Sequence, residues 1–272
     1  MNLLDVIANR ARASRARVGV GTGAVTINES MFADITSASD FADIVLIGKA
    51  QELRTINPDL EIIYSEDPEV ELVRQLADGR IDAAVRGTLS ATKTLSHLRS
   101  VFKMSSLQRL ALLTTADGTP FFLAPVGIDE GNSRDDKIEL ICKSVSYITK
   151  FGIHAKVAVL SGGRFEDVGR SAQVDQSLAD GDFITGKLRE LGIDAKHYGI
   201  LIEDAIKDAN FLVAPDGITG NLIFRTLTFL GGGNGFGAPV LMKRVFVDTS
   251  RVKTNLSNAI MLASALAWTG DR

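Results

Sequence analysis

Cysteine and histidine are scarce in this chain of 272 residues, and their scarcity excludes several kinds of site. Cys142 is the only cysteine, so no disulfide can form within the chain, and a reducing, cytoplasmic location is expected. The three histidines, His97, His154 and His197, lie far apart in the sequence. A zinc site needs about four ligands, so no metal is predicted. Histidines this scattered also give no basis for a Ser-His-Asp set, and no Gly-x-Ser-x-Gly motif occurs.

A long apolar run and an excess of one charge sign are also missing. The apolar run 259–263 stops at Ser264, whereas a membrane span needs about 20 residues, so no membrane partner is predicted. The 30 basic and 33 acidic residues give a net charge of −3, which argues against nucleic acid as a partner. We interpret the arginine-bearing N-terminal segment as an amphipathic first helix with a solvated basic face rather than a transit peptide, because Asp5 is present and no cleavage signature follows.

The chain does have a core-forming composition and alternating helix and strand patterns. Hydrophobic residues make up 45% of it, enough for one large domain or two smaller ones. Short apolar runs such as 44–47 are typical of strands buried on both faces. Helices are expected at 3–15, 29–39, 68–78, 91–102, 135–150, 170–190, 219–230 and 254–268, and strands at 17–20, 43–48, 61–65, 81–87, 109–115, 120–124, 156–161, 210–216, 239–243 and 244–249. This order predicts an α/β fold with mainly parallel sheets in a three-layer αβα arrangement.

The pattern loosens around 103–108 and 231–238, which are the candidate crossings between two subdomains. Segment 231–237, GGGNGFG, is similar to a phosphate loop only in composition. A Walker loop continues with Gly-Lys-Ser/Thr and a helix, whereas Ala238-Pro239 follows here. We therefore expect a flexible hinge or crossover at this segment.

Sites in open parallel sheets lie beyond the carboxyl ends of the strands, so the residues that follow each strand are the candidates. They are 21–24, 87–92, 161–164, 216–221 and 250–255. Segment 211–235 is a strand end followed by a helix N-terminus, which favours an anion. Segment 160–164, LSGGR, is either a turn or the lip of a cleft.

Segment 18–24, VGVGTGA, matches the glycine spacing of dinucleotide-binding proteins and of many methyltransferases. A dinucleotide site also needs an acid at the far end of the next strand. Asp43 is at the near end, and Gly48-Lys49 is at the far end. We therefore favour a strand end that needs close backbone packing, and keep an adenosyl cofactor as the alternative.

Two further strand ends carry hydroxyls and cations. Segment 86–92, RGTLSAT, could bind a phosphate group through its amides and hydroxyls, with Arg86 as counter-charge, or Ser90 could cap the next helix. Segment 248–255, DTSRVKTN, offers an anion site at Ser250, Arg251 and Lys253, or again a cap.

Several segments together resemble the phosphate acetyl/butyryltransferases. They occur in the order of that family and cover most of the chain: ADGRIDAAVRG (77–87), KSVSYITKFGIHAKVAVLS (143–161), GDFITGKLRELGID (181–194), NFLVAPDGITGNLIFRTLTFLGG (210–232) and VDTSRVKTN (247–255). Within that superfamily the chain is most similar to the shorter methanogen-associated branch, the methanogenesis marker protein 4 or MtxX proteins.

The resemblance implies an isocitrate/isopropylmalate dehydrogenase-like fold, with two subdomains flanking a cleft in which coenzyme A and an acyl phosphate meet. Residues 1–102 and 239–272 would form the first subdomain and 103–238 the second. A homodimer is implied as well, with phosphate or acyl phosphate as the small-molecule partner.

Carried over to this chain, the resemblance implies that Ser250 and Arg251 handle the phosphoryl group. The resemblance implies five binding residues: Gly87, Thr88, Thr92, Asp216 and Asn221. Ser90 joins them as a hydroxyl that follows a predicted strand. The chain departs from the family at Ser257, where many acetyltransferases have a carboxylate, and at Arg86, where a small residue is usual. An acyltransferase-like protein is the first hypothesis. A methyltransferase or its accessory, and a non-catalytic partner that kept the fold, are the alternatives.

Overall fold

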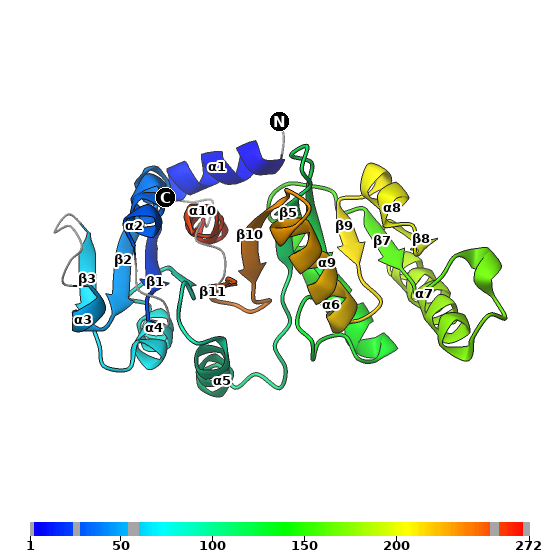
Figure 1. Cartoon of the computed structure of the whole chain (residues 1–272), viewed down its shortest axis with the longest axis horizontal. Helices are drawn as coiled ribbons and strands as arrows, with labels where there is room; N and C mark the ends of the chain where they lie inside the picture. The colour runs from blue at the N-terminus through cyan, green and yellow to red at the C-terminus, as the bar shows by residue number, and fades with distance from the viewer. Residues whose placement is uncertain (1–2, 24–27, 54–59, 251–255, 269–272) are drawn as a thin grey trace. The chain divides into compact units, whose positions relative to one another are not determined.

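The computed structural model describes residues 3–23, 28–53, 60–250 and 256–268, with only the backbone of residues 51 and 52 (Figure 1). The chain divides into two compact units. Unit 1 contains residues 1–107 and 236–272, and unit 2 contains residues 108–235. The cleft expected between two subdomains stays a prediction.

The sheet of unit 1 is parallel apart from its last strand. Its order is β3 (Glu61–Tyr64), β2 (Asp43–Gly48), β1 (Arg17–Gly21), β4 (Ala83–Val85), β11 (Val245–Asp248) and β10 (Asn234–Pro239). Only β10 pairs in the antiparallel sense, with β11, among these described strands. The carboxyl ends of β1, β4 and β11 therefore lie at one edge of the sheet.

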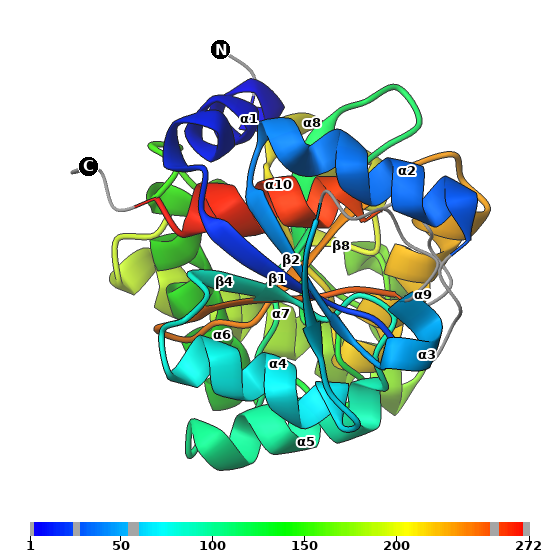
Figure 2. The same cartoon turned by 90° about the vertical axis from the view of Figure 1, so that its left-hand side faces the viewer.

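Helices cover both faces of this sheet (Figure 2). On one face lie α2 (Glu29–Ser37), η1 (Ala38–Asp40) and α10 (Ser257–Leu266), with α1 (Leu3–Ser14) packed on α10; on the other lie α4 (Pro68–Ala77) and α5 (Ala91–Val101). A short helix, α3 (Ala50–Leu53), follows β2. Side chains alternate between the two faces along a strand, so each strand contributes residues to the cores on both faces of the sheet. Val20 joins the core under α2 and α10, whereas Val45 and Ile47 join the core under α4.

The strands of unit 2 also have a parallel centre. Their order is β5 (Ala111–Thr114), β6 (Pro120–Ala124), β9 (Phe211–Val213), β7 (Val157–Leu160) and β8 (Ala195–Gly199). β5 pairs antiparallel with β6, and the other pairs are parallel. The helical elements are α6 (Arg134–Thr149), η2 (Phe165–Asp167), α7 (Ala172–Glu190), α8 (Ile202–Asp208) and α9 (Gly217–Phe229). α7 and α8 both pack on β7 and β8.

The predicted α/β fold, with mainly parallel sheets in a three-layer αβα arrangement, is confirmed. One local prediction is wrong: a strand was expected at 239–243, whereas β10 occupies 234–239. The crossing expected within 231–238 is where the chain passes from one unit to the other, since unit 2 ends at Gly235 and unit 1 resumes at Phe236. The pairing of β10 with β11 through Ala238 and Pro239 makes residues 234–237 of the glycine-rich segment part of a strand. β8 and α8 were not predicted. In the described residues, no helix has the length and apolar character that crossing a membrane requires.

Candidate functional site

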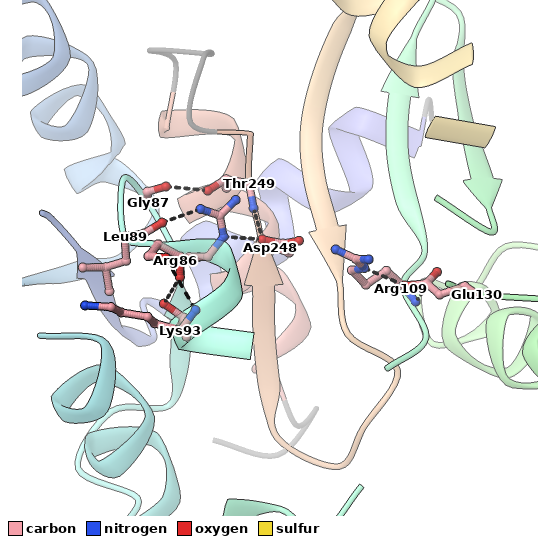
Figure 3. Close-up of polar contacts among 10 residues, drawn as sticks. Arg86, Gly87, Leu89, Lys93, Arg109, Glu130, Asp248 and Thr249 are labelled. Atoms are coloured by element: carbon pink, nitrogen blue, oxygen red, sulfur yellow. Dashed lines mark hydrogen bonds and ion pairs between the residues drawn. The ribbon is translucent and has the colours of Figure 1, made fainter. Parts of the chain in front are cut away.

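Two motifs that are far apart in the sequence meet at the strand-end edge of unit 1. β4 and β11 are parallel neighbours, with Val85 opposite Val247. The segments that leave these strands, 86–90 and 248–250, therefore start side by side (Figure 3). Both segments were selected from sequence as separate anion-site candidates, and the parallel pairing brings them together.

Arg86 joins these two segments through a buried ion pair. Arg86 is only 3% exposed. Its Nε donates to Asp248 Oδ1 at 2.5 Å, and its Nη1 donates to the Leu89 carbonyl at 2.6 Å. Asp248 Oδ1 also accepts the backbone N–H of Thr249 at 3.0 Å. Asp248 thus supplies a counter-charge to this guanidinium inside the unit, and the role of Arg86 as counter-charge to a bound anion stays a prediction. Sequence reasoning did not identify Asp248 as the partner of Arg86. A buried arginine needs a counter-charge, but the sequence alone does not show which acidic residue supplies it.

The turn after β4 is tied to both neighbouring strand ends. Gly87 has a positive φ of 61°, and its carbonyl accepts the hydroxyl of Thr249 at 3.0 Å. Thr88 donates its backbone N–H to the Gly21 carbonyl at 3.0 Å, and its hydroxyl accepts the Gly23 N–H at 3.0 Å. The loops that follow β1, β4 and β11 therefore form one hydrogen-bonded cluster, which we call the unit 1 edge.

The remaining candidates of unit 1 border this edge. Ser90 is the N-cap of α5, and its hydroxyl accepts the N–H of Lys93 at 3.5 Å. Thr92 is exposed in the first turn of the same helix. Ser250 is half-buried directly after β11. Arg251, the cation that the family resemblance selected, lies outside the described residues.

The glycines of segment 18–24 serve packing in this structure. Gly19 and Gly21 lie inside β1 rather than in a loop before a helix. A Cβ on Gly21 would lie 2.8 Å from the carbonyl oxygen of Arg86, closer than a side chain tolerates. The favoured interpretation, a strand that needs close backbone packing, fits this arrangement. Residues 24–27 lie outside the described part of the chain.

Asp216 belongs to unit 2, where it caps α9. Its Oδ1 accepts the backbone N–H of Thr219 at 2.7 Å, and its Oδ2 accepts the Thr219 hydroxyl at 3.1 Å. This carboxylate therefore occupies the helix N-terminus that the sequence offered to an anion.

Asn221 is engaged with the backbone of the same unit. Its side-chain amide donates to the Val126 carbonyl at 2.9 Å. The Val126 N–H in turn donates to Glu130, a buried carboxylate that pairs with Arg109 at 2.6 Å (Figure 3). This network fixes the connection between β6 and α6 against α9.

Unit 2 contains a pocket of about 470 Å³ at the carboxyl ends of β7 and β9. The first three residues of segment 160–164, LSGGR, line it, which agrees with the interpretation of this segment as the lip of a cleft. Its lining residues are Leu160, Ser161, Gly162, Gln173, Val174, Ser177, Ile200, Ile202, Pro215, Asp216, Thr219 and Ile223.

A Ser-His-Asp hydrogen-bond chain stands at this pocket, although none was predicted. Ser161 Oγ lies 2.5 Å from His197 Nε2, and His197 Nδ1 lies 2.7 Å from Asp182 Oδ1. This hydrogen-bond chain could not be predicted from sequence. Ser161 follows β7, Asp182 lies on α7, and His197 lies on β8, a strand that was not predicted. The scattered histidines were a weak guide, since spatial neighbours need not be close in sequence. Among the described residues, no cluster of three or more His, Cys, Asp or Glu side chains could hold a metal.

Comparison with known proteins defines the family. No protein-family model matches the chain. It is 54% identical over 266 residues to the "Putative methyltransferase mtx subunit X" of Methanosarcina mazei, across 97% of this chain and 95% of that protein. The chain belongs to the mtx subunit X family. The resemblance to the methanogen-associated branch is thereby confirmed.

Solved structures show which fold the mtx subunit X family has. A branched-chain phosphotransacylase from Enterococcus faecalis matches with a TM-score of 0.70 at 19% identity, over 93% of this chain and 99% of that one. A 4-hydroxythreonine-4-phosphate dehydrogenase from Klebsiella pneumoniae matches with a TM-score of 0.64 at 12% identity, over 93% and 99%. At such identities the likeness establishes the shared fold and leaves the reaction open.

Proposed function

We propose that this member of the mtx subunit X family binds phosphate or an acyl phosphate at the unit 1 edge, as an acyltransferase-like protein of the phosphate acetyl/butyryltransferase type. The observation that supports this is the joining of the loops after β4 and β11 by the Arg86–Asp248 pair. The Thr249 hydroxyl donates to the Gly87 carbonyl, and Ser250 and Arg251 follow Thr249 directly in the sequence.

The edge offers hydrogen-bond donors for phosphoryl oxygens. A serine or threonine hydroxyl that accepts one bond keeps its own hydrogen to donate. Thr88 and Ser90 both accept backbone N–H groups. Their hydroxyl hydrogens are the donors we assign to the phosphate group, with Arg251 as the cation that compensates its charge. Arg86 acts in this proposal as a positioning residue that holds the two loops together.

Coenzyme A is the acyl acceptor we propose for this site. In many acetyltransferases a carboxylate follows the Ser-Arg element, and Ser257 stands there in this chain. The Ser257 hydroxyl donates to Asp34 Oδ1 at 2.9 Å, and the Leu256 and Ser257 N–H groups also bond Asp34. These bonds occupy both carboxylate oxygens of Asp34 and tie the start of α10 to α2. The homodimer implied by the family resemblance belongs to the same proposal.

Ligand-induced thermal stabilisation tests the phosphate site. We expect inorganic phosphate and acetyl phosphate to raise the Tm of the wild type. Arg251→Ala should weaken their binding about tenfold or more, because a hydrogen bond to a charged group contributes roughly 1.5–3 kcal/mol. Arg12→Ala, which removes a described arginine of α1, is the matched control. Equal Tm shifts in both variants would overturn the site, and no shift with any of phosphate, acetyl phosphate or coenzyme A would overturn the function.

The name of the Methanosarcina mazei relative supports a second candidate, a methyltransferase or a methyltransferase-associated protein. Calorimetry with S-adenosylmethionine distinguishes it from the first. Heat of binding at millimolar cofactor, lost on Gly23→Val, would favour the methyltransferase. An absence of heat under the same conditions would reject a cofactor site at segment 18–24.

A further inference from the structure

We propose that Ser161 is a nucleophile, and that the unit 2 pocket takes an activated, uncharged acyl ester or thioester whose acyl group Ser161 accepts. Ser161 lines the pocket at the end of β7 and is 2% exposed. Its Oγ is 2.5 Å from His197 Nε2. A serine hydroxyl needs an adjacent base to become a nucleophile, and this contact supplies one.

The third member of the chain sets the tautomer of the base. Asp182 Oδ1 lies 2.7 Å from His197 Nδ1, so a proton on Nδ1 is held by the carboxylate. With that proton in place, Nε2 of a neutral imidazole is an acceptor and faces the Ser161 hydroxyl. This is the arrangement in which a histidine takes a proton from serine and a carboxylate stabilises the resulting imidazolium.

The surrounding residues keep this contact close. His197 is 9% exposed, and Phe165 meets its ring edge-on at 4.9 Å between centroids. Gly181 of α7 lies against the pair, and a Cβ there would overlap both His197 Nε2 and Ser161 Oγ. Only a residue without a side chain lets α7 pack this closely. Gly186, on the same helix, faces open space.

The pocket lining indicates the class of acyl donor. Apolar side chains form much of the wall: Val174, Ile200, Ile202, Pro215 and Ile223. The only charged residue among the lining is Asp216, whose carboxylate caps α9. A negative charge on the wall disfavours an anionic donor such as an acyl phosphate, and the apolar side chains suit a short hydrocarbon chain. This site is therefore independent of the phosphate site proposed for unit 1.

The proposed step balances without a further reactant. Ser161 Oγ forms a bond to the acyl carbon, its proton passes to His197 Nε2, and the bond from the acyl carbon to the leaving oxygen or sulfur breaks. The leaving group departs with the proton from Nε2. Water, deprotonated by the same nitrogen, then releases the acid and restores the hydroxyl.

A serine-directed fluorophosphonate tests the nucleophile on the full chain. Its phosphorus bonds to Oγ, fluoride leaves, and intact mass with peptide mapping locates the adduct. We expect a single adduct on Ser161, absent in Ser161→Ala and retained in Ser146→Ala, an exposed serine of α6. Absence of any adduct on the folded wild type, or an adduct that persists in Ser161→Ala, would overturn the proposal.

Hydrolysis of p-nitrophenyl butyrate tests the base and the geometry. His197→Gln should slow it by about 10²-fold or more, since general-base catalysis contributes roughly 10²–10⁴-fold. His154→Gln is the matched control, because His154 pairs with Asp194 on the surface at 3.3 Å, away from any nucleophile. Gly181→Ala should also reduce the rate while Gly186→Ala leaves it unchanged. Equal rates in His197→Gln and His154→Gln would overturn the role of His197.

The phosphate-dependent Tm shift separates this proposal from the proposed function. Ser161→Ala should keep the full shift of the wild type while it loses the adduct. If the shift is absent from every variant but the adduct forms on Ser161, the unit 1 site fails and the unit 2 site stands.

Discussion

A single glycine determines whether the loop after β4 can close onto β1. Gly87 has a φ of 61°, and a Cβ there would overlap the Gly21 carbonyl. Gly118 has a similarly positive φ of 87°, but a Cβ there meets nothing within 4 Å. We expect Gly118→Ala to cost about 1–2 kcal/mol of unfolding free energy from backbone strain alone, and Gly87→Ala to cost clearly more. Urea unfolding of both variants measures the difference, and equal costs would contradict the overlap.

The Arg86–Asp248 pair is also expected to respond asymmetrically to substitution. Asp248→Asn leaves a buried guanidinium without its counter-charge, which should lower the unfolding free energy by about 3–5 kcal/mol. The double variant Arg86→Met/Asp248→Leu removes both charges and should recover much of that loss. Denaturant unfolding of the two proteins checks this. A double variant as unstable as Asp248→Asn would show that hydrogen bonds to the loops, rather than the unpaired charge, dominate.

At the scale of elements, a buried lysine connects the first turn of α6 to the start of α9. Lys137 is buried, and its Nζ donates to the Pro215 carbonyl at 2.8 Å. Burial lowers the pKa of Lys137 from its ordinary value of 10.5, while the nearby charges of Asp180 and Asp216 act in the opposite direction. The unfolded chain therefore binds this proton more tightly than the folded chain does.

It follows that the unfolding free energy should rise with pH between the folded and unfolded pKa values of Lys137. We expect the difference between wild type and Lys137→Met to shift in favour of the wild type as the pH rises from below the folded-state pKa of Lys137 towards about 10.5. Urea unfolding across that range measures it, and groups common to both proteins cancel. Parallel curves for the two proteins would show that folding leaves this pKa unchanged.

The elements with a strong periodic pattern were predictable from sequence, and the site was predictable only in part. β2, with four consecutive apolar residues, was predicted at its observed bounds. β8, with the sequence AKHYG, has a lysine and a histidine among its five residues and no apolar run, so no pattern marked it. His197 lies on that strand, and its link to Ser161 depends on parallel pairing with β7.

The anion-site candidates show the same limit. The rule that sites follow strand ends selected segments 87–92 and 250–255 separately, and only the parallel pairing of β4 with β11 shows that the two strands before them are neighbours. It could not show that Arg86 points inward to Asp248, because the direction of a side chain depends on packing that only the folded structure supplies.

For the whole molecule, the two units differ in how the sequence is divided between them. Unit 2 is one continuous stretch, whereas unit 1 is closed by both ends of the chain through the contact of α1 with α10. Ser264 of α10 is fully buried at this contact. Its hydroxyl accepts the Ala16 N–H at 3.1 Å and donates to the Phe41 carbonyl at 2.7 Å.

Ser264→Ala should therefore destabilise unit 1 selectively. The variant leaves a buried N–H and a partly buried carbonyl without this partner, at a cost of about 1–3 kcal/mol. We expect amide hydrogen exchange to accelerate on β1 and α10 while the amides of β6, β7 and β9 keep their protection, because all the bonds lost lie in unit 1. Ser144→Ala is the control in unit 2, since the buried Ser144 hydroxyl has no hydrogen-bond partner among the described residues and its removal should cost nothing. Uniform acceleration across both units would show instead that they unfold as one cooperative body.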